Sequence, residues 1–405
     1  MRRRIDQRSL LLAAIIGCWT ASGSTAGADW VSCQNKPTRD CLLEEAFRGD
    51  SGPLTGKDRL DVMIQGGALA HPDWVTAADV VEAQRLALSV REVSAVYYAN
   101  IAIHGLVAAN QKQQAIDLVA SLGDARQSMA INELVRDLVK AGDLQTALAV
   151  TDRMQPPPGP NALLRVKRSI IASAMKALAE TGKTDQAVML LLDQKYLTEH
   201  EAADIQVAVG QAFAKRGEAN LAQGYFDQAT RNLEAARGYS IGPAPDTRFR
   251  LEAIRILALR GQVDAVNAAI QQERSAPGVR ASDASTEYER SQGYQRIVGA
   301  LLDARQPEAA LNLAKSLTPD GTKQAALVAI ATWDTSNDRI ADARAVYASM
   351  NNAQEATARG VIARSLAAYS AKVGDVASAL RFVGELRDPT NRRGMLFAIA
   401  HILPR

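Results

Sequence analysis

One short phrase recurs along the chain, and it constrains the fold more than any other feature of the sequence. A helix-like stretch runs into a small or polar turn residue, and a small apolar residue follows five positions later. The clearest copies are LVKAGDLQTALAV, LAETGKTDQAVML, FAKRGEANLAQGY and SAKVGDVASALRF. The eight turn residues are Asn110, Gly142, Gly182, Gly217, Gly261, Arg305, Asp338 and Gly374. The residues that follow are Ala115, Ala147, Ala187, Ala222, Val266, Ala310, Ala343 and Ala379.

These turns are 32, 40, 35, 44, 44, 33 and 36 residues apart. Apolar residues precede them at three- and four-residue intervals, as at Ile131, Leu134, Val135 and Leu138, which predicts helices with one buried face. Glycine tolerates the left-handed geometry that ends a helix. A helical hairpin of this size does not bury its apolar face alone. The period therefore predicts an all-α fold, an α-solenoid of stacked antiparallel hairpins, rather than separate globular domains.

The turn-and-alanine phrase with this spacing resembles the tetratricopeptide repeat in a degenerate form. The resemblance covers about residues 93–385, although the aromatic residue that often opens the first helix is mostly Ala, Ile or Leu here. Loop-forming insertions at 238–247 and 275–287 widen two of the spacings, and QPPPGP at 155–160 is typical of a stiff link. Other helical-repeat families give a similar signal. The resemblance implies a concave face that binds a protein or peptide.

Residues 1–28 have the layout of a secretory signal peptide. Four arginines precede an apolar core at 10–17, and Ala26-Gly27-Ala28 offers a small-residue cleavage signal. The apolar run is shorter than the roughly 20 residues that span a bilayer. We therefore expect export to the periplasm. A faint lipoprotein-box pattern at Ile15-Ile16-Gly17-Cys18 leaves a lipid anchor at Cys18 as an alternative.

Two further cysteines, Cys33 and Cys41, are separated by seven residues. A thioredoxin-type redox pair is spaced C-x-x-C, and zinc normally takes four Cys or His ligands. No histidine lies between residues 29 and 70. Because exported thiols close in sequence usually pair, we predict a structural disulfide between Cys33 and Cys41.

The remaining chain divides into two parts on this interpretation. Residues 29–92 are expected to form a helical cap, stapled by the disulfide, that seals one end of the array. Residues 93–405 form the repeat array, and a helix starting at Asp388-Pro389 closes its other end.

The net charge of +3 is wholly accounted for by the predicted signal peptide, which carries four arginines and one aspartate. The rest of the chain is neutral, and only 5% of all residues are aromatic. Nucleic-acid binding needs a basic surface and stacking platforms, so we expect no nucleic-acid partner. No apolar run after residue 28 is long enough to predict a transmembrane helix.

Two matches to catalytic motifs lack the context that those motifs need. Residues 238–242 match G-x-S-x-G, but a helix precedes them and Gly-Pro-Ala-Pro follows, whereas the nucleophile elbow joins a strand to a helix. Ser173 and Lys176 match S-x-x-K without the companion motifs S-D-N and K-T-G. The four histidines are scattered, with no H-E-x-x-H and no phosphate-binding glycine loop. The sequence therefore predicts no catalytic residue, cofactor or metal ligand.

Residues 13, 10 and 6 positions before each turn are expected to face the groove of such an array. The ligand-binding candidates are Tyr97, Asn100, His104, Asn132, Arg136, Lys176, Gln211, Arg248 and Arg255. Met129, Ser169, Asp204, Gln292 and Gln295 occupy the same positions. The cations Arg136, Lys176 and Arg255 recur six residues before their turns and are expected to line one wall, which favours a ligand with carboxylates. Replacing all three with alanine is expected to weaken binding while the fold survives.

The leading hypothesis is a non-enzymatic, exported scaffold that binds an envelope protein or peptide, of acidic character if the cations contact it. One alternative is a lipid-anchored accessory subunit of an envelope assembly or a polysaccharide-export machine. A second is an envelope hydrolase that uses the helices as a frame. The hydrolase needs a catalytic carboxylate in a compact domain, and only some 20 residues follow the last repeat.

Overall fold

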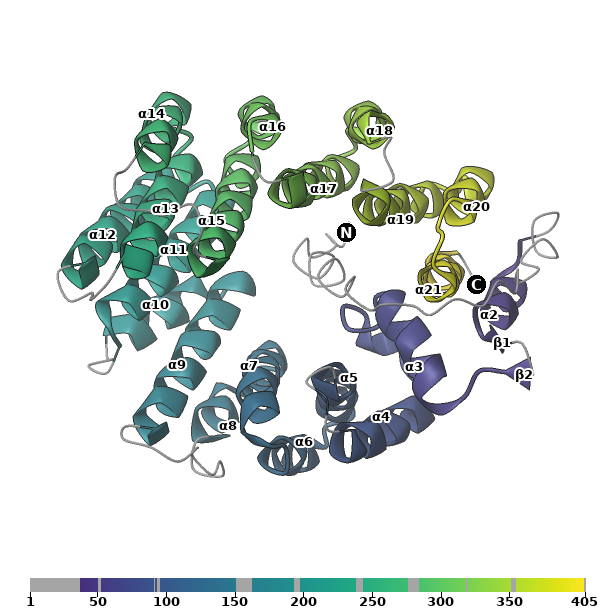
Figure 1. Cartoon of the computed structure of the whole chain (residues 1–405). Coiled ribbons are helices and arrows are strands. Elements are labelled where there is room, and N and C mark those ends of the chain that lie inside the picture. The colour runs from purple at the N-terminus through teal and green to yellow at the C-terminus, as the bar shows by residue number, and fades with distance from the viewer. Residues whose placement is uncertain are drawn as a thin grey trace. The chain divides into compact units, whose positions relative to one another are not determined.

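The computed structural model of the chain describes residues 37–49, 52–90, 92, 95–150, 162–192, 197–237, 243–275, 284–317, 320–350 and 355–403. These residues form twenty α-helices, one 3-10 helix and a single pair of two-residue strands (Figure 1). The predicted all-α class is confirmed. The chain divides into two compact units: a middle unit, Arg91–Thr318, and a terminal unit that combines Met1–Val90 with Pro319–Arg405. The predicted signal peptide, Cys18 and Cys33 lie outside the described residues, so the disulfide stays a prediction.

The middle unit contains twelve of the described helices, which alternate between first and second members of hairpins. They are α5 (Ala95–Ala108), α6 (Lys112–Ala120), α7 (Asp124–Lys140), α8 (Leu144–Ala149), α9 (Ala162–Glu180), α10 (Thr184–Leu192), α11 (Glu199–Lys215), α12 (Ala219–Arg237), α13 (Pro243–Leu259), α14 (Val263–Arg274), α15 (Ala284–Asp303) and α16 (Pro307–Lys315). Each first helix packs against the second helix that follows it.

All eight predicted turn residues adopt a positive φ, which confirms the turn assignment. The five glycines have φ between 70° and 84°, and Asn110, Arg305 and Asp338 have φ of 60–62°. At Gly142 the amide of Asp143 donates to the carbonyl of Leu138 at 2.8 Å, which satisfies a free acceptor at the end of α7. The small residue five positions later is buried in every hairpin, with at most 3% exposure. The second helix can therefore lie close to the first.

First helices pack side by side within two groups of the middle unit. Helices α5, α7, α9 and α11 form one series, and α13 packs on α15 in the other. The two series are connected through α12, which packs on α11 and on α13. The spacing of 44 residues between the turns at Gly217 and Gly261 falls at this point. The amide of Gln211 in α11 also donates to Asp303 in α15 at 2.9 Å, and this bond joins the two series directly.

The terminal unit is built from both parts of the chain. Its elements are α2 (Arg39–Ala46), β1 (Arg48–Gly49), β2 (Gly52–Pro53), α3 (Gly56–Gln65), the 3-10 helix η2 (Pro72–Trp74), α4 (Ala77–Ser89), α17 (Asp320–Ser336), α18 (Ile340–Ser349), α19 (Ala356–Lys372), α20 (Val376–Gly384) and α21 (Pro389–Ile402). Strands β1 and β2 pair antiparallel, with Gly49 opposite Gly52. Helices α17 to α20 form the last two hairpins, which brings the described total to eight.

Helix α21 packs on α2 and α3, so the first and last described helices cover each other (Figure 1). The N-terminal segment and the last helix were expected to seal opposite ends of the array, and this direct contact differs from that expectation. Phe397 of α21 is 1% exposed and meets the rings of Phe47 and Trp74 edge-on at 5.6 and 5.9 Å. Trp74 stacks between His71 and His401, with ring centroids 4.1 and 4.9 Å away. An aromatic core therefore joins the two segments.

No helix in the described part of the chain is long and apolar enough to cross a membrane.

Candidate functional site

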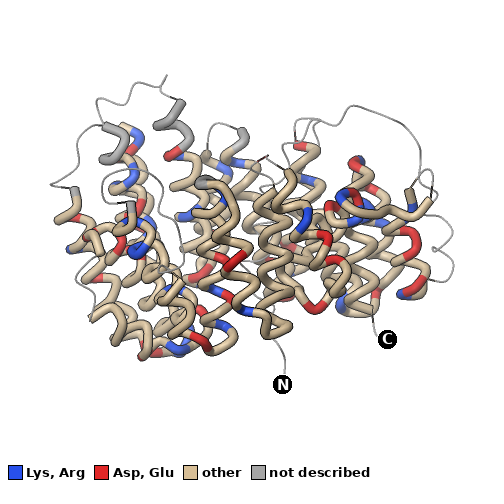
Figure 2. Tube along the Cα trace, turned by 90° about the horizontal axis from the view of Figure 1, so that it is seen from below, with Lys and Arg blue, Asp and Glu red and all other residues tan. Residues whose placement is uncertain are grey.

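The polar side chains of the first helices in the middle unit form the candidate site, which we call the polar face. Every predicted groove residue that was put forward as a ligand-binding candidate lies on one of these helices. Tyr97, Asn100 and His104 lie on α5, Asn132 and Arg136 on α7, Lys176 on α9, Gln211 on α11, and Arg248 and Arg255 on α13. In the described part of the chain, lysines and arginines are interspersed with aspartates and glutamates (Figure 2).

Helices α5 and α7 hold their polar residues mostly out of solvent. Nδ1 of His104 contacts Oδ2 of Asp137, and both side chains are only 10% exposed. Asn100 is 9% exposed, and its Oδ1 has no hydrogen-bond partner among the described residues. Tyr97 is half-buried. This end of the polar face is a packed polar layer rather than an open surface.

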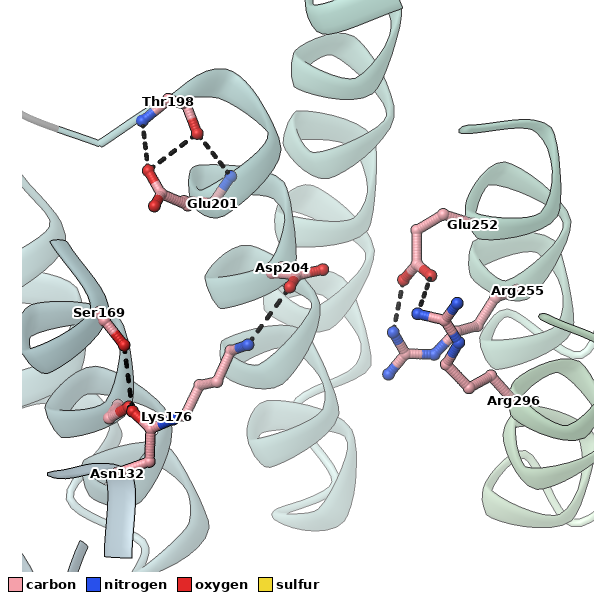
Figure 3. A network of polar contacts seen from close by, with 10 residues as sticks. Asn132, Ser169, Lys176, Thr198, Glu201, Asp204, Glu252, Arg255 and Arg296 are labelled. Atoms are coloured by element: carbon pink, nitrogen blue, oxygen red, sulfur yellow. Dashed lines mark hydrogen bonds and ion pairs between the residues drawn. The ribbon is translucent and has the colours of Figure 1, made fainter. Parts of the chain in front are cut away.

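Asn132 links α7 to α9. Its Oδ1 accepts hydrogen bonds from Ser169 and Ser173 at 3.1 and 2.7 Å, so the side-chain amide is held in one orientation (Figure 3). Ser173 is thus bonded to Asn132, whereas Lys176 extends to Asp204 of α11 at 3.3 Å. The S-x-x-K match therefore does not bring its serine and lysine together, because each side chain is bonded to a different helix.

Asp204 forms an ion pair with Lys176 at a partly exposed position. The lysine and aspartate side chains are 40% and 30% exposed. Burial opposes ionisation of Asp204, but the positive charge of Lys176, with contributions from His200 and Arg255, outweighs it and holds the pKa of this carboxyl below its usual value. Asp204 is therefore ionised at neutral pH.

Glu252 is a buried carboxylate between two arginines (Figure 3). Its side chain is 4% exposed, and it pairs with Arg255 one turn further along α13. Arg296 of α15 approaches the other carboxylate oxygen at 3.6 Å. Both guanidinium groups compensate the charge of Glu252, and the arrangement ties α13 to α15.

The predicted wall of cations is therefore neutralised within the protein. Arg136 pairs with Glu133 at 2.6 Å, Lys176 with Asp204, and Arg255 with Glu252. The prediction of a cationic wall considered only the repeat position of each residue and therefore missed the carboxylates beside them. Two of them were visible in the sequence, because Glu133-x-x-Arg136 and Glu252-x-x-Arg255 are i,i+3 pairs on one helix face. The third comes from a neighbouring helix, which the sequence does not place.

Arg248 and His200 take no part in these ion pairs. Arg248 is exposed and forms no ion pair with the described residues. His200, which sequence reasoning assigned no role, lies on α11 with its ring edge-on to Phe249 of α13, 5.6 Å away. Both of its ring nitrogens are buried and have no hydrogen-bond partner in the part of the chain that the structure describes. Burial lowers its pKa, and Arg248 and Lys176 act in the same direction, against Asp204 and Glu252.

No protein-family model matches the chain, and no curated protein sequence matches it significantly.

Among the described residues, no group of three or more His, Cys, Asp or Glu side chains is arranged to hold a metal ion.

Proposed function

We propose that the chain is a non-enzymatic, exported scaffold of the tetratricopeptide-like α-solenoid type, and that it binds a protein or peptide of the cell envelope. The more accessible part of the polar face, from Asn132 of α7 to Arg248 of α13, is the proposed binding surface. The observation that supports this proposal is the succession of hairpins whose first helices present polar side chains in series. Stacked helical repeats use such surfaces to bind extended ligands.

The pairing of charges across helices supports binding by a pre-organised surface. Lys176 and Asp204 hold each other, and Asn132 is fixed by two serines. Side chains already held in place lose less conformational entropy when a ligand arrives. The exposed guanidinium of Arg248 adds an unpaired cation, which favours a partner that carries carboxylates.

Site-specific photo-crosslinking tests this proposal. A photoreactive amino acid is placed at Arg248 on the polar face, or at Met189 on the second helix α10 as a matched control, and irradiated in native envelopes. Met189 is 68% exposed and Arg248 is also exposed, so both positions are accessible to a partner. We expect a discrete adduct from position 248 that is absent from position 189. An adduct from position 189 with none from 248 would place the binding surface on the second helices.

Replacing Arg136, Lys176 and Arg255 together is a poor test of binding, contrary to the sequence-based expectation. Removal of Arg255 leaves Glu252, a carboxylate that is 4% exposed, with Arg296 at 3.6 Å as its remaining cation. Breaking a buried pair on one side strongly destabilises a protein, by roughly 3–5 kcal/mol. Lost binding in that variant would therefore report unfolding.

A further inference from the structure

The opposing surfaces of α11 and α13 concentrate titratable groups around one imidazole. His200 and Asp204 are four residues apart on α11, so they share a face of that helix. Arg248 and Glu252 are likewise four apart on α13, and Phe249 contacts His200. Lys176 reaches this place from α9 through Asp204. Three helices thus bring two cations and two carboxylates near His200.

His200 is unsatisfied in this arrangement. The imidazole is half-buried, but both of its nitrogens are buried and have no hydrogen-bond partner among the described residues. The carboxylates beside it are already engaged, because Asp204 pairs with Lys176 and Glu252 with Arg255 and Arg296. The ring therefore has no available acceptor among its charged neighbours.

The charged groups that act on His200 are two cations, Lys176 and Arg248, and two carboxylates, Asp204 and Glu252. Both carboxylates are already paired with cations of the protein. Arg248 is the cation without an ion-pair partner among the described residues, and its side chain is exposed. A site with an unpaired guanidinium next to an imidazole that lacks an acceptor is complementary to an oxyanion.

We propose that Arg248 and His200 form a subsite for an oxyanion, a carboxylate or a phosphate, which is held more tightly when His200 carries a proton. The anion would accept hydrogen bonds from the exposed guanidinium of Arg248 and, once the ring turns a nitrogen toward it, from the protonated imidazole. It would also offset the repulsion that Arg248 and Lys176 exert on an imidazolium at this position. Anion binding and proton uptake by His200 therefore favour each other.

The direction of the pH dependence follows from this linkage. Without an anion, burial and the two cations keep the pKa of His200 below its ordinary value of 6.5. A bound anion raises it, so affinity is lowest above the bound-state pKa and increases as the pH falls toward the free-state pKa. Each unit between the two pKa values corresponds to about a tenfold change in affinity.

Histidine NMR on the full chain tests the subsite without any protein partner, so this proposal and the proposed function fail separately. The chain has four histidines, and His200→Gln assigns the signal of His200. The pKa of His200 is measured in sodium chloride, sodium acetate and sodium phosphate at equal ionic strength. We expect acetate or phosphate to raise it by about 0.5–1 unit relative to chloride. The anion that acts identifies the ligand chemistry.

Arg248→Gln is the matched variant, because an exposed, unpaired side chain is replaced and the fold should be retained. In this variant we expect the anion-specific rise to disappear. Equal pKa values of His200 in all three salts would overturn the proposal. So would an anion-specific rise that persists in Arg248→Gln.

Discussion

At the scale of single residues, Asp334 in α17 couples stability to pH. Its side chain is 3% exposed, and burial raises its pKa to about 6, although Arg339 at 3.3 Å acts in the opposite direction. The folded-state pKa thus lies above the ordinary value of 3.8. The contribution of this group to stability is complete below about pH 4 and is lost as the pH rises through about 6.

We expect Asp334→Asn to remove that loss. At pH 8 the variant should gain about 1–3 kcal/mol in the free energy of unfolding over the parent protein, and at pH 4 the gain should be smaller. Urea titrations at both pH values measure the difference. Asp342→Asn is a second test, because the charge of Asp342, whose side chain is 53% exposed, also raises the pKa of Asp334. It should give a smaller gain at pH 8 than Asp334→Asn. A gain that is equal at the two pH values would contradict the assigned cause.

At the scale of elements, helices α3 and α21 cross where two glycines meet. A Cβ atom on Gly394 would lie 2.8 Å from both the Cβ of Gln65 and the amide nitrogen of Gly66. On Gly66 it would lie 2.5 Å from the carbonyl oxygen of Gly394. The helices approach this closely because neither residue has a side chain. Phe397, one turn further along α21, is buried in the same contact.

We expect Gly394→Ala to force the two helices apart and to destabilise the terminal unit by about 1–3 kcal/mol. Thermal or urea unfolding measures this loss. Gly360→Ala in α19 is the matched control, because its new methyl group would meet only Leu386 at 3.8 Å. Alanine raises helix propensity there and should be neutral or stabilising by up to about 1 kcal/mol. Equal behaviour of the two variants would show that the crossing tolerates a methyl group.

At the scale of the whole molecule, the terminal unit depends on segments from both parts of the chain. Leu42 of α2 and Leu60 of α3 are at most 1% exposed, and α21 packs on both of their helices. Removing residues 389–405 would therefore expose apolar surface on helices more than three hundred residues earlier in the sequence. Such surface contributes roughly 25 cal/mol per Å² while it is buried.

We expect that deletion to raise amide hydrogen exchange in α2 and α3, while α5 to α12 of the middle unit keep their protection. Mass spectrometry of peptides resolves the two regions, and deletion of residues 404–405 alone is the control. If α2 and α3 stayed protected without α21, the packing of the terminal unit would not depend on that helix.

The sequence alone determined the hairpins because their signals are local. Turn residues such as Gly142 and Asn110 are compatible with a positive φ, and that geometry is set within a few residues of the chain. Small residues such as Ala147 and apolar ones such as Leu134 identified the buried side of each helix in the same way. Helical periodicity carries this information without any knowledge of neighbouring hairpins.

Only the tertiary structure decided which side chains pair and which segments meet. The charges of Lys176 and Asp204 belong to different hairpins, and Gln211 reaches Asp303 across 92 residues. No local pattern fixes such contacts, because they depend on the rotation and offset of one helix against another. The same reason explains the packing of α21 on α2 and α3. Two apolar helix faces at distant positions cover each other, whereas the sequence shows only that each needs a cover.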